Sequence, residues 1–301
     1  MLNRIIASDA FYSFSRQPLV VVSAVVAATF ILAAAFAPWL APHNPFDLST
    51  VSLLDAKTPP VWQDGGTWTY PLGTDHQGRD ILSAIIYGSR VSLLVALPST
   101  LIAMTIGVAL GLLAGYAGGR VDAVLMRLAD IQLSFPAILV ALLIDGIARV
   151  IAPKSLHDEL AIWVMILSIS LATWVHFARP VRAQTMVERR KDYVQAARLL
   201  QIPAMAIVVR HILLNVIEPV LVIGTVGFGL AIITEATLSF LGVGMPASQP
   251  SLGTLVRTGN DFLFSGFWWM AIFPGTALLL LVMSVNLLGD WLRDVFNPRL
   301  S

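Results

Sequence analysis

Six long apolar stretches limit what this chain can fold into. Each is close to the 20 or so residues that an α-helix needs to cross the hydrocarbon core of a bilayer. They are predicted at residues 19–40, 91–116, 124–144, 160–178, 220–241 and 267–288, and Pro136 is expected to bend the third of them. Only 12% of the 301 residues are charged and 57% are hydrophobic, whereas soluble domains carry about 25% charged residues. The sequence therefore predicts an all-α polytopic membrane protein with six transmembrane helices.

The first apolar stretch has a second interpretation, a cleaved signal peptide. Arg4 and Arg16 precede it, and the small residues AAAFA at 33–37 resemble a cleavage site. The hydrophobic region of a signal peptide is about 7–15 residues long, and the uncharged run here extends from 17 to 42. We therefore expect an uncleaved first span.

The distribution of positive charge predicts the orientation. If the N-terminus is inside, most of the 19 Lys and Arg residues fall on the inside, as the positive-inside rule requires. Both termini are then cytoplasmic. The long loop between the first two spans would lie outside, and it is rich in the turn residues Pro, Gly, Asn and Asp. We expect two parts: residues 1–90 with the first span and this loop, and residues 91–301 with five helices.

A polar stretch at residues 179–219 separates the fourth and fifth spans. Pro203 suits the first turn of a helix but not its interior, so the stretch predicts two short helices with a turn near 201–202. Apolar residues Ile207, Val208, Ile212 and Leu213 would share one face of the second helix. Such an apolar ridge flanked by cations predicts a docking site for a partner, and a helix bound only to lipid is the alternative. The basic residues of the stretch are Arg179, Arg182, Arg189, Arg190, Lys191, Arg198 and Arg210.

Glycines at positions 107, 111 and 115 share one face of the second span. Small residues at this spacing let another helix backbone approach closely, so we predict helix packing there, with a place on a solute path as the alternative. In the fifth span, Glu235 either pairs or is hydrated near the outer helix end or serves as a gate, since a buried charge is costly. Asp130 and Asp145 are expected to mark the ends of the third span, and His176 to be packed or interfacial rather than a proton carrier.

Several kinds of chemistry have no candidate residues. None of the three lysines follows a glycine, as a P-loop requires. HExxH is absent, and the five histidines lack metal-ligand spacing. The chain has no cysteine, which excludes a thiolate metal site or a cysteine nucleophile. We therefore expect no enzyme activity and no cofactor in the chain itself, and no nucleic-acid partner.

The polar stretch resembles the EAA signature of binding-protein-dependent ABC importer permeases. Gln195-Ala196-Ala197 stands for its opening triplet, Gln201 for its glycine, and Ile212 with Leu214-Asn215 for its end. Gln195 replaces Glu, Gln201 replaces Gly and Leu214 replaces Pro. Beyond this stretch, the chain is similar over nearly its whole length to the second permease of the dipeptide, oligopeptide and nickel class. The matching segments are SRQPLVVVS, APWLAPHNPFD, YPLGTDHQGRDILSAIIYGSRVSL, ITEATLSFLGVG and FPGTALLLLVMSVNLLGDWLRDVFNPRL.

The resemblance implies the type I ABC importer architecture in a bacterial inner membrane, with cytoplasmic coupling helices. It implies a second, homologous permease, two ABC ATPase subunits that hold ATP and Mg²⁺, and a periplasmic solute-binding protein. Residues 91–301 would be the permease core. The coupling loop would use Gln195, Ala196, Ala197 and Gln201, with Arg198 and Arg210 as flanking cations, while Glu235 is a candidate gate. The cargo would be a peptide or a related small solute.

Two other classes of function remain open at this point. An ion-coupled secondary transporter would use Glu235 or Asp130 to carry protons, although no internal repeat is evident between the two halves. An accessory membrane subunit would have no solute path of its own.

Overall fold

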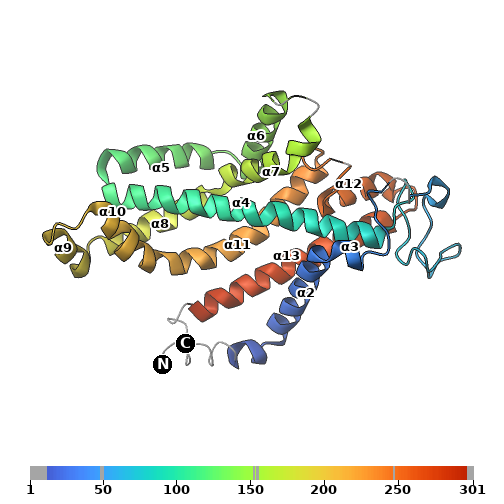
Figure 1. Ribbon diagram of the computed structural model, residues 1–301, viewed down its shortest axis with the longest axis horizontal. Coiled ribbons are helices and arrows are strands. Elements are labelled where there is room, and N and C mark those ends of the chain that lie inside the picture. Colours follow the sequence, from blue (N-terminus) through green and yellow to red (C-terminus); the bar gives the residue numbers. More distant parts are fainter. Residues whose placement is uncertain (1–11, 48–50, 152, 154–155, 247, 297–301) are drawn as a thin grey trace.

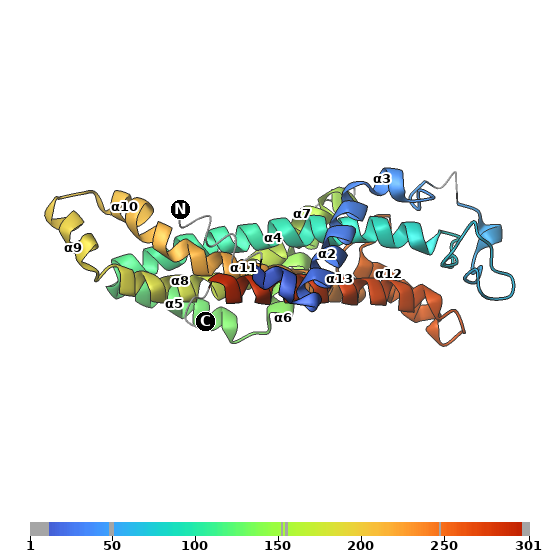
Figure 2. The ribbon, with the colours of Figure 1, turned by 90° about the horizontal axis from the view of Figure 1, so that it is seen from below.

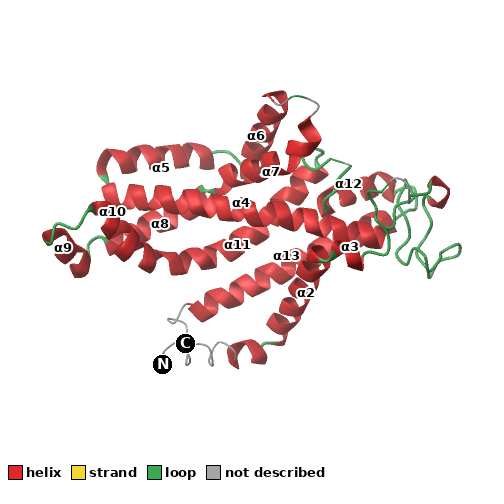
Figure 3. Ribbon diagram, viewed as in Figure 1, coloured by secondary structure: helices red, strands yellow, loops and turns green. Residues whose placement is uncertain are grey.

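The computed structural model describes residues 12–47, 51–151, 153, 156–246 and 248–296. Within these ranges all regular elements are helices (Figure 3), which confirms the all-α class. Four helical stretches are long and apolar enough to cross a membrane, and two bent helix pairs raise the number to six if each pair is one span. The four are α2 (Pro18–Ala35), α4 (Ile81–Ala117), the run Ala204–Phe240 and α13 (Trp269–Phe296).

The other elements are shorter or broken. The bent pairs are α5 (Gly119–Leu133) with α6 (Ala137–Ile151) and α7 (His157–Thr173) with α8 (Val175–Glu188). The run Ala204–Phe240 consists of α10 (Ala204–Ile207), the π-helical turn η3 (Val208–Ile212) and α11 (Leu213–Phe240). The remaining elements are α3 (Ala37–Leu40), η1 (Leu53–Asp55), α9 (Asp192–Leu199) and α12 (Leu252–Leu263).

Helix α4 begins ten residues earlier than the apolar stretch predicted, because Asp80 caps it. The Asp80 carboxylate accepts hydrogen bonds from the backbone N–H groups of Leu82 and Ser83, which have no partner inside the helix. The helix ends at Gly118, whose φ of +67° suits a residue without a Cβ. The expected division of the chain at residue 90 falls inside α4 and stays a prediction.

The third predicted span is not one continuous helix. The chain breaks at residues 134–136, and α5 and α6 meet at 93°. The predicted bend at Pro136 is confirmed, but the single helix at 124–144 is wrong, because Pro136 disrupts the helical hydrogen bonding and the chain turns rather than curves. Asp145 does not mark a helix end: it is buried within α6 and pairs with Arg149 at 2.6 Å. Asp130 lies in the last turn of α5 and pairs with Arg179 of α8.

The fourth predicted span divides at Trp174 into α7 and α8, with a bend of 41°. Helix α8 extends ten residues beyond the predicted end, and His176 is exposed on it. Helix α12 was not predicted, because its 12 residues include Arg257 and Asp261 and are too few to span a bilayer.

The glycines of α4 pack against α8, which confirms the predicted close approach of two helices. A Cβ added at Gly107 would lie 2.6 Å from the backbone oxygen of Trp174, and one at Gly111 would lie 2.6 Å from that of Ala178. At Gly115 it would meet the side chain of Thr185 at 2.6 Å. Only glycine lets the two backbones lie this close.

The helices form an elongated bundle with two distinct ends (Figures 1 and 2). Helix α4 runs along its length, α9 lies beyond one end of α4, and α10 lies beside that end. We call this the basic end. Segments 41–47 and 51–80 (called the 41–80 loop below), α3 and α12 lie toward the opposite end, here called the loop end. There the Trp269 indole N–H donates to the Thr74 carbonyl at 3.1 Å, which fixes the loop to the start of α13.

Candidate functional site

The basic end is built around the short helix α9 and the turn that follows it. Two backbone hydrogen bonds close this turn: Gln201 N–H donates to the Arg198 carbonyl at 3.0 Å, and Ile202 N–H donates to the Ala197 carbonyl at 3.1 Å. Gln201 between them has φ +58°. This is a Schellman C-cap, in which the left-handed position is normally glycine. The predicted turn near 201–202 is therefore present.

The second predicted helix is not separate. Pro203 precedes α10, which continues through the π-helical turn η3 into α11, so the chain from Ala204 to Phe240 passes directly into a membrane span. Its expected apolar face points inward. Ile207 and Ile212 are fully buried beside Val194 and Ala197 of α9. The prediction that this face forms an exposed docking ridge is wrong, because its residues Ile207 and Ile212 pack against α9 inside the bundle.

Other apolar side chains are exposed at the tip of the basic end, and sequence periodicity did not single them out. Leu199 is 85% exposed, Leu200 76% and Met205 74%. Leu199 and Leu200 lie at the C-terminal end of α9, where Val194 and Ala197 are buried, and Met205 lies in α10, directly after the turn. We call these three residues the tip patch. The sequence did contain one sign of this patch, an apolar run that continues past the end of a short helix.

The residues expected in the coupling loop are placed differently from one another. Gln195 and Ala196 are exposed, whereas Ala197 is buried. The Gln195 amide donates to the Arg189 carbonyl at 2.9 Å, across the start of α9. The Arg198 guanidinium lies 5.1 Å from the centre of the Tyr116 ring of α4, a cation–π distance. Arg210 is exposed on η3.

A hydrogen-bond network that the sequence did not reveal joins α9 to its neighbours. Glu188 at the end of α8 accepts hydrogen bonds from Lys191 and from the Tyr193 hydroxyl, both at 2.6 Å. The Asn215 amide of α11 donates to the Tyr193 hydroxyl at 3.1 Å. Burial and then the hydrogen bond to Glu188 raise the pKa of Tyr193 to about 12, so this hydroxyl keeps its proton at neutral pH.

Arg189 fixes the same region to α4. Its guanidinium donates to the backbone carbonyls of Gly115 at 2.9 Å and Tyr116 at 3.1 Å. These carbonyls lie at the end of α4, where no further helical N–H is available. A cation at a helix C-terminus also interacts favourably with the helix dipole. Helices α4, α8, α9 and α11 therefore meet at the basic end.

Glu235 lies far from this site, in the core near the loop end. Its side chain is fully buried. It accepts hydrogen bonds from the hydroxyls of Ser92 and Ser239, both at 2.7 Å. The Ser92 oxygen also accepts the backbone N–H of Leu252 at 3.3 Å, at the start of α12. Glu235 does lie near an end of α11, as expected, but it is fully buried rather than exposed to solvent, and serine hydroxyls rather than a cation hydrogen-bond to it.

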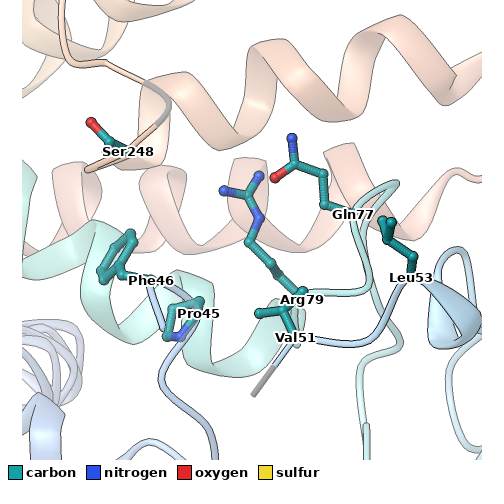
Figure 4. Close-up of a pocket in the computed structure, with 7 residues that line it drawn as sticks. All are labelled: Pro45, Phe46, Val51, Leu53, Gln77, Arg79 and Ser248. Atoms are coloured by element: carbon teal, nitrogen blue, oxygen red, sulfur yellow. The ribbon is translucent and has the colours of Figure 1, made fainter. Parts of the chain in front are cut away.

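The loop end also contains a cavity of about 540 Å³. It is lined by residues of the 41–80 loop and by one residue of the segment after α11 (Figure 4): Pro45, Phe46, Val51, Leu53, Gln77, Arg79 and Ser248. Arg79 is mostly buried, and its Nε donates to Asp75 at 2.7 Å. Because Arg79 is already paired, the cavity has no strong charge to offer to a ligand.

Metal chemistry has no candidate site in the part of the chain that the structure describes. No group of three or more His, Asp or Glu side chains there is placed to hold a metal ion. Glu188 and Glu235 are instead held by a lysine and by hydroxyl groups.

Known proteins match this chain over nearly its whole length. Residues 107–301 match the family described as binding-protein-dependent transport system inner membrane component, and residues 7–60 match the N-terminal TM domain of oligopeptide transport permease C. Among similar proteins, the di/tripeptide transport system permease protein DppC of Pseudomonas aeruginosa is 38% identical, over 90% of this chain and 85% of the relative. The dipeptide transport system permease protein DppC of Escherichia coli is 39% identical, over 97% and 93%.

The dipeptide transport system permease protein DppC of Haemophilus influenzae is 37% identical, over 92% of this chain and 91% of its own length. The family match covers α5 to α13 and includes the basic end, and the second match covers α2 and the beginning of the loop. These matches agree with the helical membrane architecture and confirm the family inferred from the sequence. The chain is a multi-pass permease subunit of an ABC importer and belongs to the family of binding-protein-dependent transport system inner membrane components.

Proposed function

We propose that this permease forms one half of a heterodimeric path that imports di- or oligopeptides, and that its basic end docks an ABC ATPase. The tip patch is the observation that carries the docking site. Three apolar side chains are exposed at the far end of the bundle, where α9 projects away from the spans (Figure 2). Apolar residues exposed together at one place are typical of protein interaction sites.

The position of the tip patch supports a protein partner rather than lipid. Arg198 and Arg210 are exposed beside it, and α9 is held at the end of the bundle, beyond the spans. A helix lying in the membrane interface would instead run along the bilayer surface with its apolar side inserted. Gln195, Ala196 and Gln201 lie at the same tip and complete the proposed contact surface.

The docking proposal is tested by Leu200→Asp in the complete transporter. We expect the ATPase subunits to be lost during co-purification, since a carboxylate is costly to bury in an apolar contact. Leu54→Asp at the loop end is the matched control, because Leu54 is 96% exposed. Unchanged co-purification and uptake in Leu200→Asp would remove the tip patch from the mechanism. Ala197 is a poorer position for this test, because it is buried and its substitution disturbs the packing of α9 itself.

The remaining parts of the machine are proposed from the family. A second homologous permease would complete the path, two ATPase subunits would hold ATP and Mg²⁺, and a periplasmic solute-binding protein would deliver the cargo at the loop end. Both termini would be cytoplasmic in the bacterial inner membrane. The first 11 residues and the last five lie outside the described residues, so the orientation rests on the charge distribution.

The peptide cargo is proposed because the relatives named above are di- and tripeptide or dipeptide permeases. Its test is uptake of a labelled dipeptide by cells or proteoliposomes that contain the complete transporter. We expect uptake to stop when ATP is depleted and to continue when an uncoupler removes the proton gradient. The reverse result would favour an ion-coupled carrier.

For Glu235 we propose a positioning role at the start of α12 rather than a place on the path, because two serines enclose its carboxylate.

A further inference from the structure

Four side chains at the basic end form a continuous hydrogen-bonded relay. Glu188 accepts from Lys191 and Tyr193, both at 2.6 Å, and Tyr193 accepts from Asn215 at 3.1 Å. Asn215 also donates to the His211 carbonyl at 2.7 Å, which fixes its amide on α11. We call Glu188, Lys191, Tyr193 and Asn215 the Glu188 relay.

The carboxylate at its centre is expensive to place where it lies. The Glu188 side chain is only 2% exposed, and a buried charge is tolerated only when cations or hydrogen-bond donors satisfy it. Lys191 and Tyr193 satisfy one oxygen each. Glu188 is therefore enclosed by its partners, whereas Lys191, Tyr193 and Asn215 are themselves exposed.

The relay connects three different helices. Glu188 ends α8, Tyr193 lies in the first turn of α9, and Asn215 lies in the first turn of α11. Helix α9 has only eight residues, too few to be stable alone in water. Its orientation relative to α8 and α11 therefore depends on such contacts and on the burial of Val194 and Ala197.

We propose that Tyr193 and Glu188 are positioning residues that make α9 move as one body with the ends of α8 and α11. This rests on the proposed function, in which an ATPase grips α9. When the ATPase displaces α9, the relay carries the displacement to two different spans at once. Without it, α9 swings on the turns at either side, and ATP is hydrolysed without a matching movement of the spans.

Tyr193→Phe is the sharpest test, because it removes one hydroxyl and keeps the ring that lies beside His211. In the complete transporter in proteoliposomes, we expect ATPase subunits to remain bound and ATP hydrolysis to continue. Solute transported per ATP hydrolysed should fall about ten-fold, the order expected for losing a hydrogen bond to a charged group. An unchanged ratio would overturn the proposal.

Docking and transmission are separated by comparing two variants. Leu200→Asp tests docking and should lose the ATPases, whereas Tyr193→Phe should keep them. If Tyr193→Phe also lost the ATPases, Tyr193 would belong to the docking surface and the transmission role would be wrong. Asn215→Leu gives an independent measurement, since it breaks the same relay on α11. The double variant should be no worse than either single variant if both break one relay, and additive losses would contradict the proposal.

A distance measurement distinguishes transmission from loss of stability. The chain has no cysteine, so spin labels can be attached at Asp192→Cys on α9, outside the proposed contact surface, and at Glu218→Cys on α11, both exposed positions. In the otherwise unchanged protein, we expect their separation to stay constant when ATP binds, because the helices move together. In Tyr193→Phe the distribution of distances between the two labels should broaden or shift on ATP binding.

Glu188→Gln keeps an oxygen acceptor for the Tyr193 hydroxyl and should therefore retain more transport per ATP hydrolysed than Glu188→Leu does. Equal losses in the two variants would argue against the hydrogen bond as the connection.

Discussion

Gln201 occupies a backbone conformation that glycine adopts more easily. Its φ is +58°, and a residue with a Cβ pays about 1–2 kcal/mol in this left-handed region. Gln201→Gly should therefore stabilise the turn by about 1 kcal/mol and slow local amide exchange about five-fold. Hydrogen exchange of the amides around Leu200–Ile202 measures this effect. Gln201→Ala is the matched control and should give no such gain; equal protection in both variants would show that the turn is not strained.

His76 at the loop end has a half-buried ring that is poorly placed to accept a proton. Its ring stacks on Phe262 at 5.1 Å, and its Nδ1 is buried with no hydrogen-bond partner. The Lys57 ammonium lies over the same Phe262 ring at 5.1 Å. Burial lowers the pKa of His76, with Arg79 and Lys57 acting in the same direction and Asp75 and Asp261 opposing them.

Acidification should therefore destabilise the loop end. Because the folded-state pKa of His76 is below its ordinary value of 6.5, the unfolded state binds more protons, and stability is lost as pH falls from above 6.5 through the folded-state value. The unfolding temperature of the purified protein, compared at pH 7.5 and pH 5, measures this. His76→Phe keeps the stacked ring and should reduce the pH dependence. A pH dependence that is the same in both proteins would exclude His76 as its cause.

At the scale of helices, the contact between α4 and α8 depends on glycine. A Cβ at Gly111 would lie 2.6 Å from the Ala178 carbonyl oxygen. This oxygen belongs to the backbone of α8, which cannot easily move away from the added methyl group. Gly111→Ala should destabilise the protein by about 1–3 kcal/mol. Gly146→Ala is the matched control: Gly146 lies on α6 with no atom within 4 Å of an added Cβ, so alanine there should be neutral or stabilising by up to about 1 kcal/mol. Thermal unfolding in detergent compares the two, and similar losses would contradict the packing argument.

Gln132 holds the two broken helix pairs together. Its amide nitrogen donates to the carbonyls of Leu171 and Ala172, at 2.8 and 2.9 Å, and its oxygen accepts the Trp174 indole N–H at 2.8 Å. One side chain near the break in the first pair thus satisfies groups at the break in the second. Gln132→Leu should lower the free energy of unfolding by about 1–3 kcal/mol, because it leaves these groups without that partner.

Trp174→Phe tests the same contact from the other side. It removes only the indole N–H and should cost less than Gln132→Leu in the same thermal unfolding measurement. If Gln132→Leu had no effect, water or neighbouring groups would have to replace all three hydrogen bonds, and Gln132 would not hold the breaks.

The sequence predicted the existence of these elements better than their ends. Apolar length identified α2, α4, α11 and α13, because crossing a bilayer requires it. It placed the start of α4 too late, since Asp80 extends the helix into less apolar residues by capping. Pro136 predicted a bend, but no local pattern fixes whether a chain bends or turns by 93°. That angle depends on packing partners such as Gln132 and Trp174.

Features of the site that depend on neighbouring residues in the sequence could be predicted, whereas contacts between different helices could not. The turn at Gln201 followed from Pro203 and the spacing of short helices. The inward direction of Ile207 and Ile212 depends on α9 folding back over them, which periodicity does not encode. Glu188 and Asn215 are 27 positions apart in the sequence, and their shared partner Tyr193 becomes visible only when α8, α9 and α11 are placed together.

At the scale of the whole molecule, the basic end and the loop end should lie on opposite sides of the membrane. Because the chain lacks cysteine, single cysteines report this directly. Gln201→Cys should react with a membrane-impermeant thiol reagent from the cytoplasmic side, and Asp64→Cys from the outer side, in vesicles of known orientation that contain the permease without ATPases. Both positions are exposed. Labelling of both from the same side would contradict the proposed topology.

Helix α4 reaches from one side to the other without a break. Its 37 residues give a length of about 55 Å at 1.5 Å per residue, well beyond the roughly 30 Å of the hydrocarbon core. A tilt of about 10° about one end of a straight helix of this length displaces the other end by about 10 Å. Arg189 clamps one end of this rod, and Asp80 caps the other beneath the 41–80 loop. Under the proposed docking of the ATPases at the basic end, a small rotation there would become a displacement several times larger at the loop end.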